Sequence, residues 1–252
     1  MSTDAVTRSP ETVSFARRAA FIALRLLVAG AIVAALVVTF SSSSAAWNTA
    51  GYPDRATLVT NFWSFFTVES NAGAVVVLTI GAILLLTSKN PAVADPRWYN
   101  LLRACIATYM TITGIVYNLL LRGVAVSGAA EDPHPWTNEV LHVIGPIYLV
   151  LDWVLAPGRR PVPWKRIAVI LAFPLAWTVY TLLRGPLVFD QVRERETWYP
   201  YPFLDPSLSA NGYLSVSFYV IMITILFGVV GSLVVWVSRR EIPRSNSGIL
   251  AE

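Results

Sequence analysis

The sequence predicts an all-α polytopic membrane protein, built as a bundle of six transmembrane helices. Of its 252 residues, 55% are hydrophobic and only 13% are charged, whereas an average soluble domain carries about 25% charged residues. Six apolar segments reach the roughly 20 residues that a bilayer core requires. Nine Trp and ten Tyr suit the aromatic belts found at the ends of membrane spans.

The six predicted spans alternate with connections that carry the polar and helix-breaking residues. The spans lie at residues 20–40, 62–86, 99–121, 137–156, 165–184 and 212–237. No internal repeat is visible, so we expect one transmembrane domain over 20–240, with cytoplasmic tails at 1–19 and 241–252. The longest connection, 185–211, contains an aromatic–proline cluster that we expect to lie along the membrane interface.

Three residues within the spans, two charged side chains and a proline, carry expectations of their own. Arg25 in the first span is expected to extend its guanidinium toward the near interface. Asp152, near the inner end of the fourth span, is expected to pair with Arg159 or Arg160. Pro174 predicts a kink in the fifth span, which membrane helices tolerate when a neighbour satisfies the freed carbonyl.

Lys and Arg are concentrated on one side of the predicted bundle. If the N-terminus is cytoplasmic, that side holds Arg8, Arg17, Arg18, Lys89, Arg97, Arg159, Arg160, Lys165, Arg166, Arg239, Arg240 and Arg244. The opposite side holds Arg55, Arg122, Arg184, Arg193 and Arg195. Because cytoplasmic loops carry the excess of basic residues, we expect both termini in the cytoplasm, in a multi-pass protein of the plasma membrane.

The second span opens with polar side chains that membrane helices usually avoid. An ionisable group such as Glu69 costs roughly 2.5–3.5 kcal/mol at the centre of a membrane helix. Such side chains should therefore turn toward other helices or a wet cavity. Positions three and four apart share a helix face, which gives one polar stripe made of Ser64, Thr67, Ser70 and Asn71.

Thr67 and His142 are expected to lie at one depth in the outer leaflet. The second and fourth spans both enter from the outer face, and each residue lies about five residues inside, or roughly 8 Å at helical rise. Asn118 and Tyr180 approach the same level from the third and fifth spans. Asn138 shares a helix face with His142.

A hydroxyl that faces an imidazole is the minimal set of groups for nucleophilic acyl transfer. The imidazole, with an unperturbed pKa near neutrality, takes the hydroxyl proton while the oxygen attacks a carbonyl. In a plainer interpretation, Thr67 bonds its own helix and His142 makes a structural interhelical hydrogen bond. Glu69 would orient the imidazole, bind a polar head group, or lie buried as a neutral acid.

Cofactor and metal chemistry find little support in the sequence. No Walker, Rossmann, CxxC or HExxH pattern occurs, and the lone Cys105 excludes a disulfide framework. His134, Glu139 and His142 are a weak zinc candidate, because two histidines are few for a catalytic zinc site. We expect no cofactor, no metal and no nucleic-acid partner.

Two short motifs carry a resemblance to a known family. They are Phe65-Phe66-Thr67-Val68-Glu69-Ser70-Asn71 and Asn138-Glu139-Val140-Leu141-His142-Val143-Ile144-Gly145-Pro146. With its six spans, the chain resembles a bacterial member of the androgen-induced-gene family of membrane proteins. The animal members are threonine hydrolases that cleave fatty acid esters of hydroxy fatty acids. The resemblance implies that Thr67 is the catalytic threonine and His142 the catalytic histidine.

The expected function is therefore hydrolysis of long-chain lipid esters within the membrane. Thr67 would be the nucleophile and His142 the general base, and the lipid would enter laterally from the bilayer. Asn71, Asn118 or Tyr180 would donate hydrogen bonds to the oxyanion. The other supporting or substrate-binding candidates are Glu69, Ser70 and Asn138.

A non-catalytic membrane protein is the alternative. A small transporter would place its polar site near the midplane, often between repeated halves with broken helices. A scaffold that binds a lipid or a protein partner needs no match between Thr67 and His142. If the two residues face different neighbours, with no cavity between them, the scaffold is the better interpretation.

Overall fold

The computed structural model describes residues 11–89, 92–123 and 134–240. The predicted tail 241–252, the first ten residues of the tail 1–19 and most of the connection 122–136 lie outside these ranges. So do Arg8 and Arg244, which contributed to the predicted charge bias.

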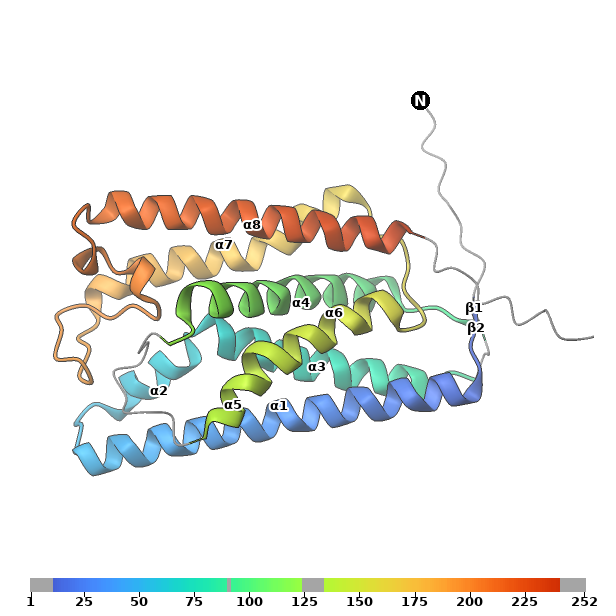
Figure 1. Cartoon of the computed structure of the whole chain (residues 1–252), viewed down its shortest axis with the longest axis horizontal. Coiled ribbons are helices and arrows are strands. Elements are labelled where there is room, and N and C mark those ends of the chain that lie inside the picture. The colour runs from blue at the N-terminus through green and yellow to red at the C-terminus, as the bar shows by residue number, and fades with distance from the viewer. Residues whose placement is uncertain (1–10, 90–91, 124–133, 241–252) are drawn as a thin grey trace, which may run out of the picture.

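The predicted class, an all-α polytopic membrane bundle, is confirmed. Within the described residues, six helical segments are long and apolar enough to cross a membrane, and Figure 1 shows them side by side. The helices are α1 (Phe15–Ala50), α3 (Phe66–Thr87), α4 (Arg97–Val116), α5 with α6 (Pro135–Glu139 and Gly145–Leu155), α7 (Ile167–Arg184) and α8 (Tyr213–Arg239). At the centre, α4 contacts α3, α6, α7 and α8.

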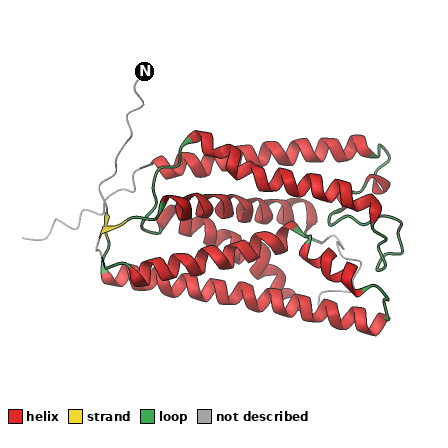
Figure 2. Ribbon diagram, turned by 180° about the vertical axis from the view of Figure 1, so that it is seen from behind, coloured by secondary structure: helices red, strands yellow, loops and turns green. Residues whose placement is uncertain are grey.

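Strands are almost absent from the described part of the chain (Figure 2). Two residues of β1 (Glu11–Thr12) pair antiparallel with two of β2 (Ala92–Val93). This short ladder joins the segment before α1 to the connection between α3 and α4.

The first helix is longer than the predicted span 20–40. It begins at Phe15, after Ser14 accepts a hydrogen bond from the Arg17 N–H, and it continues through the serine run to Ala50. Its 36 residues measure about 54 Å at helical rise, well beyond a hydrocarbon core of roughly 30 Å. Thus α1 extends into what was predicted as a tail and a connection.

The second predicted span, 62–86, is not one continuous helix. The chain leaves α2 (Arg55–Trp63) at Ser64, takes an extended conformation at Phe65 and starts α3 at Phe66. Trp177 Nε1 donates to the Ser64 carbonyl at 3.0 Å. A break inside a membrane bundle is tolerated where neighbours satisfy the freed backbone groups in this way.

Two π-helical turns interrupt the third and fourth spans. The first, η1 (Tyr117–Leu121), ends the segment that begins with α4, and the second, η2 (Val140–Ile144), joins α5 to α6. Single π-helical turns are rare and occur frequently at functional sites. Residues 117–121 and 140–144 are therefore candidate parts of a functional site.

Pro174 lies inside α7, as predicted, and leaves the carbonyl of Ile170 without its usual N–H partner. The hydroxyl of Tyr109 on α4 donates to that carbonyl at 2.9 Å. The expectation that a neighbour satisfies the freed carbonyl is confirmed.

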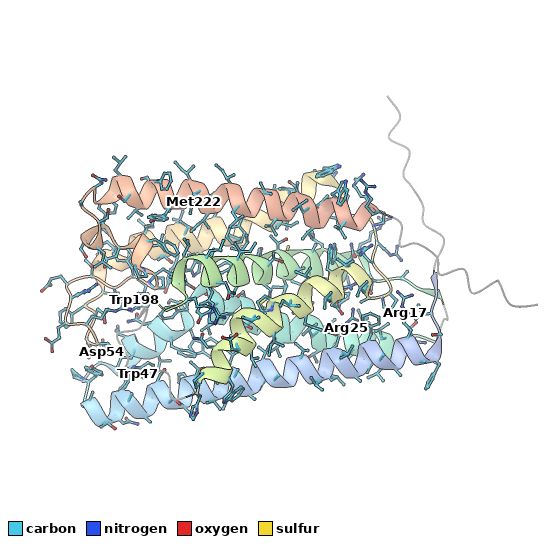
Figure 3. All side chains as sticks on the ribbon, in the orientation of Figure 1. Arg17, Arg25, Trp47, Asp54, Trp198 and Met222 are labelled. Carbon is cyan, nitrogen blue, oxygen red and sulfur yellow. The ribbon has the colours of Figure 1, made fainter. Side chains whose placement is uncertain are left out.

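The aromatic cluster in the connection between α7 and α8 packs against the bundle, and its expected position along the membrane interface stays a prediction. Trp198, Tyr199 and Tyr201 are buried, because the segment folds over the end of the bundle before η5 (Pro202–Leu204) and η6 (Pro206–Leu208). Figure 3 shows Trp198 at the same end as Trp47 and Asp54. Tyr201 thereby reaches the start of α3.

A buried ion-pair network occupies the other half of the bundle. Asp152 on α6 accepts from Arg25 of α1 at 2.8 Å and from Arg103 of α4 at 2.9 Å. Arg103 also reaches Asp95 at 2.9 Å. Two predictions are therefore wrong: Arg25 does not extend to the interface, and Asp152 does not pair with Arg159 or Arg160. A charge buried without a partner is strongly destabilising, so these charged side chains pair with one another inside the bundle.

Candidate functional site

Thr67 lies in the first turn of α3, directly after the break in the second span. N–H groups in the first turn of a helix have no partner within the helix. The Thr67 N–H donates to the Tyr201 hydroxyl at 3.2 Å, and Thr67 Oγ1 lies 3.2 Å from the same hydroxyl. The Thr67 side chain thus bonds a neighbouring segment, and not its own helix.

Tyr201 is a neutral phenol at physiological pH. Burial raises the pKa of Tyr201 to about 12, although hydrogen bonds from the Thr67 side chain and backbone oppose the rise. A neutral hydroxyl accepts from the Thr67 N–H and retains a proton of its own. Tyr201 can therefore donate a hydrogen bond at this position, and it is too weak an acid to serve as an ionised base.

An apolar cavity of about 60 Å³ adjoins Thr67. It lies between α3, α4, α7, α8 and the connection before α8, and its walls include Phe66, Thr67, Tyr117, Pro174, Tyr201 and Phe227. A single water needs about 10–15 Å³ by this kind of measure. The cavity therefore has room for a short stretch of a lipid chain.

His142 lies in the π-helical turn η2 and is held in one tautomer. Its Nδ1 is 3.0 Å from the carbonyl oxygen of Asn138. A carbonyl oxygen only accepts hydrogen bonds, so Nδ1 carries the proton and the lone pair is on Nε2. The imidazole stacks on Tyr117, with ring centroids 3.8 Å apart, and Asn138 Nδ2 donates to the Tyr117 hydroxyl at 2.8 Å.

The segments that carry Thr67 and His142 are neighbours. Asn71 Nδ2 donates to the Thr67 carbonyl at 2.9 Å and to the Leu141 carbonyl at 3.1 Å. Asn118 Nδ2 donates to the His142 carbonyl at 3.2 Å. The structure therefore brings the two motifs together through backbone contacts made by predicted polar residues.

The two side chains themselves do not meet. Thr67 Oγ1 contacts Tyr201, whereas the His142 ring contacts Asn138 and Tyr117, and among the described residues no hydrogen bond joins the hydroxyl to the imidazole. His142 is also not part of the cavity wall, although Tyr117 is. The threonine–histidine pair is therefore not assembled in this conformation.

Of the remaining predicted residues, Ser70 and Tyr180 have partners of their own. Ser70 Oγ lies 2.9 Å from Thr113 Oγ1, and Tyr180 bonds Ser64 at 2.8 Å. Glu69 also lies in the first turn of α3, where the helix dipole favours negative charge, and its Oε2 is buried without a hydrogen-bond partner among the described residues.

His134, Glu139 and His142, the weak zinc candidate, do not lie together. His134 is exposed before α5, and Glu139 pairs with Arg122 at 2.9 Å. In the part of the chain that the structure describes, no three His, Cys, Asp or Glu side chains lie close enough together to hold a metal ion.

Sequence reasoning missed Tyr117 and Tyr201. Tyr117 directly precedes the predicted Asn118, but nothing in its spacing indicates a stack on a histidine of another span. Tyr201 belongs to a Tyr-Pro-Tyr-Pro run, whose aromatic composition favours an interfacial position.

Comparison of the chain with family models, curated proteins and solved structures finds no match in any of the three.

Proposed function

We propose that this chain is an integral membrane hydrolase of long-chain lipid esters and a bacterial relative of the androgen-induced-gene family. One observation carries the proposal. Thr67 presents its hydroxyl and its N–H at the start of a broken helix, beside an apolar cavity inside the bundle. A nucleophile next to an apolar space suits an ester whose reacting carbonyl is polar and whose chains are not.

In the proposed reaction, Thr67 Oγ attacks the ester carbonyl while its proton passes to His142 Nε2. The alcohol leaves with that proton, and an acyl group remains on Thr67. Water then attacks the acyl group, again with His142 as base, and releases the fatty acid and the free hydroxyl. The tautomer inferred from the Asn138 contact, with the lone pair on Nε2, is the one that this role requires.

Thr67 N–H and the Tyr201 hydroxyl are the best-placed donors for the oxyanion. Both lie at the N-terminus of α3, where the helix dipole stabilises negative charge. The earlier candidates are already engaged, because Asn71 and Asn118 donate to backbone carbonyls and Tyr180 bonds Ser64. A substrate carbonyl would replace the present contact between Tyr201 and Thr67.

The proposal requires one rearrangement. The Tyr117 ring packs on the imidazole and also forms part of the cavity wall. Movement of this ring would open His142 to the cavity and allow Nε2 to approach Thr67 Oγ1. A lipid chain that binds in the cavity beside Tyr117 would displace the ring in this way.

The second candidate is a lipid-binding scaffold without turnover. It is favoured by the observation that Thr67 and His142 contact different neighbours, Tyr201 and Asn138 respectively. In this function the cavity would hold an acyl chain, and the two polar motifs would only join helices.

We further propose that the protein lies in the plasma membrane with its basic end in the cytoplasm. The helix ends near Arg17, Arg97, Arg160 and Arg239 belong to that end, as the excess of basic residues in cytoplasmic loops favours. Thr67 and His142 would then lie toward the opposite leaflet.

The test is hydrolysis of long-chain esters, including branched esters of hydroxy fatty acids, by purified protein in detergent. We expect Thr67→Ala to abolish turnover and His142→Ala to lower it by about 10²- to 10⁴-fold, the usual contribution of a general base. Thr178→Ala is the matched control, because Thr178 lines the same cavity but bonds its own helix at Pro174.

Turnover that survives Thr67→Ala would remove Thr67 as the nucleophile. Saturable binding of these esters without any turnover by the wild type would establish the scaffold instead. Thermal melting of each variant identifies any that has lost its fold.

A further inference from the structure

A groove runs along the outside of the bundle between α8 and the start of the α7 segment, away from Thr67. Its volume is about 590 Å³, within the roughly 300–1,000 Å³ of typical ligand sites. The walls include Trp164, Ile167, Ile225, Gly228, Ser232 and Trp236. The groove faces the surroundings of the bundle, where lipid lies.

Small residues on α8 keep the groove open. A Cβ atom added at Gly228 would meet nothing within 4 Å, and Ser232 follows one turn later on the same face. From Ile225 to Arg239, α8 rises about 21 Å at helical rise. Since one leaflet accounts for about 15 Å of the hydrocarbon core, the groove and its polar end match the depth of one leaflet.

Basic residues of both walls lie near the polar end of the groove. Lys165 and Arg166 are exposed at the start of the α7 segment. Arg239 lies over the Trp164 ring at 5.8 Å, and Arg240 lies over Trp236 at 4.1 Å. No acidic residue occurs in 164–187 or 213–240, so the sequence of the two walls supplies only basic charge at this end.

We propose that the groove binds one anionic phospholipid from the leaflet at the basic end of the bundle. An acyl chain would lie along Gly228 and Ser232, and the phosphate would bind Lys165 and Arg166. Basic pockets between membrane helices bind anionic head groups in this manner. A second copy of the chain fits less well, because a twofold contact places the same patch on both subunits and would bring two sets of these cations together.

Native mass spectrometry of the purified protein with equal amounts of phosphatidylglycerol and phosphatidylcholine tests the proposal. The wild type should retain phosphatidylglycerol preferentially. Each basic residue near an anionic surface contributes about 1 kcal/mol, so Lys165→Gln/Arg166→Gln should weaken retention by about thirtyfold. The control is Lys89→Gln/Arg97→Gln, which removes two exposed cations from the same end but not from the groove.

A second pair of variants tests the apolar part. Gly228→Leu should fill the groove and lower retention of phosphatidylglycerol, whereas Gly30→Leu should not, although a Cβ at Gly30 also meets nothing within 4 Å. Equal retention of the two lipids by the wild type would overturn the proposal. So would undiminished retention by Lys165→Gln/Arg166→Gln, or a lipid-free dimer that Gly228→Leu dissociates.

Discussion

At the scale of single residues, Tyr201 links the connection before α8 to the start of α3. Its hydroxyl accepts from the Thr67 N–H, a part-buried first-turn donor that has no partner within its own helix. A buried donor left without a partner costs about 1–3 kcal/mol. The contact therefore stabilises the fold and, in the proposed reaction, marks the position of the oxyanion.

We predict that Tyr201→Phe lowers the stability of the protein by about 1–3 kcal/mol at pH 8, because it leaves the Thr67 N–H unsatisfied. Thermal melting in detergent measures the change. Phe203→Leu is a suitable control, since Phe203 lines the same cavity without a hydroxyl.

The contribution of Tyr201 to stability should depend on pH. Because burial raises the pKa of Tyr201 from 10.0 to about 12, its contribution is complete below pH 10 and is lost as pH rises through about 12. The difference in melting temperature between wild type and Tyr201→Phe should shrink over that interval. A difference that stays constant up to pH 12 would contradict the assigned pKa.

At this scale the proximity of the two motifs could be predicted, but the contacts of their side chains could not, for physical reasons. Depth along a helix follows from residue counting, which placed Thr67 and His142 in segments that the structure makes neighbours. The direction of a side chain depends on the local helical winding, which the turn η2 changes around His142. The partners Tyr117 and Tyr201 depend on that winding and on a folded connection.

At the scale of elements, α7 shows how a neighbouring helix accommodates a proline. Pro174 frees the Ile170 carbonyl, and Tyr109 of α4 satisfies it. We predict that Tyr109→Phe costs about 1 kcal/mol, the net value of such a hydrogen bond.

A double-mutant cycle separates this bond from other effects of losing the hydroxyl. In a Pro174→Ala background the new N–H can bond Ile170 within the helix, so Tyr109→Phe should cost less there. Equal costs in the two backgrounds, measured by thermal melting, would show that the Ile170 carbonyl is not what Tyr109 stabilises.

The break between α2 and α3 and the two π-helical turns were not predictable from composition. The residues at the break, Ser64 and Phe65, include neither Gly nor Pro, the usual local signals. Contacts from other elements, such as Trp177 to the Ser64 carbonyl, stabilise the break instead. By contrast, the Pro174 effect was predictable because proline acts through its own covalent structure.

At the scale of the whole molecule, the network around Asp152 connects α1, α4 and α6. Its two arginines and two aspartates balance in charge: Arg25, Arg103, Asp95 and Asp152. The six-helix fold could be predicted from the length and hydropathy of the spans. A chain that crosses a bilayer must hydrogen-bond its backbone N–H and C=O groups internally, which a helix does. Which buried charge pairs with which depends on helix packing, and the sequence therefore misassigned Arg25 and Asp152.

We predict that Asp152→Asn destabilises the bundle by about 3–5 kcal/mol, because it leaves a buried guanidinium without its counter-charge. Glu139→Gln, which breaks the exposed pair with Arg122, should leave the melting temperature nearly unchanged. Removing both charges in Arg25→Gln/Asp152→Asn should cost less than the sum of the two single variants. Strict additivity would show that the ion pair contributes nothing.

The most direct test of Thr67 as a nucleophile is covalent trapping with a long-chain alkyl fluorophosphonate. Attack by the Thr67 hydroxyl on phosphorus expels fluoride and leaves a stable adduct, which peptide mass spectrometry locates. We predict an adduct on Thr67 that is absent in Thr67→Ala, much slower to form in His142→Ala and unchanged in Thr178→Ala. An adduct at another residue, or no adduct on protein that binds the probe, would contradict the assignment.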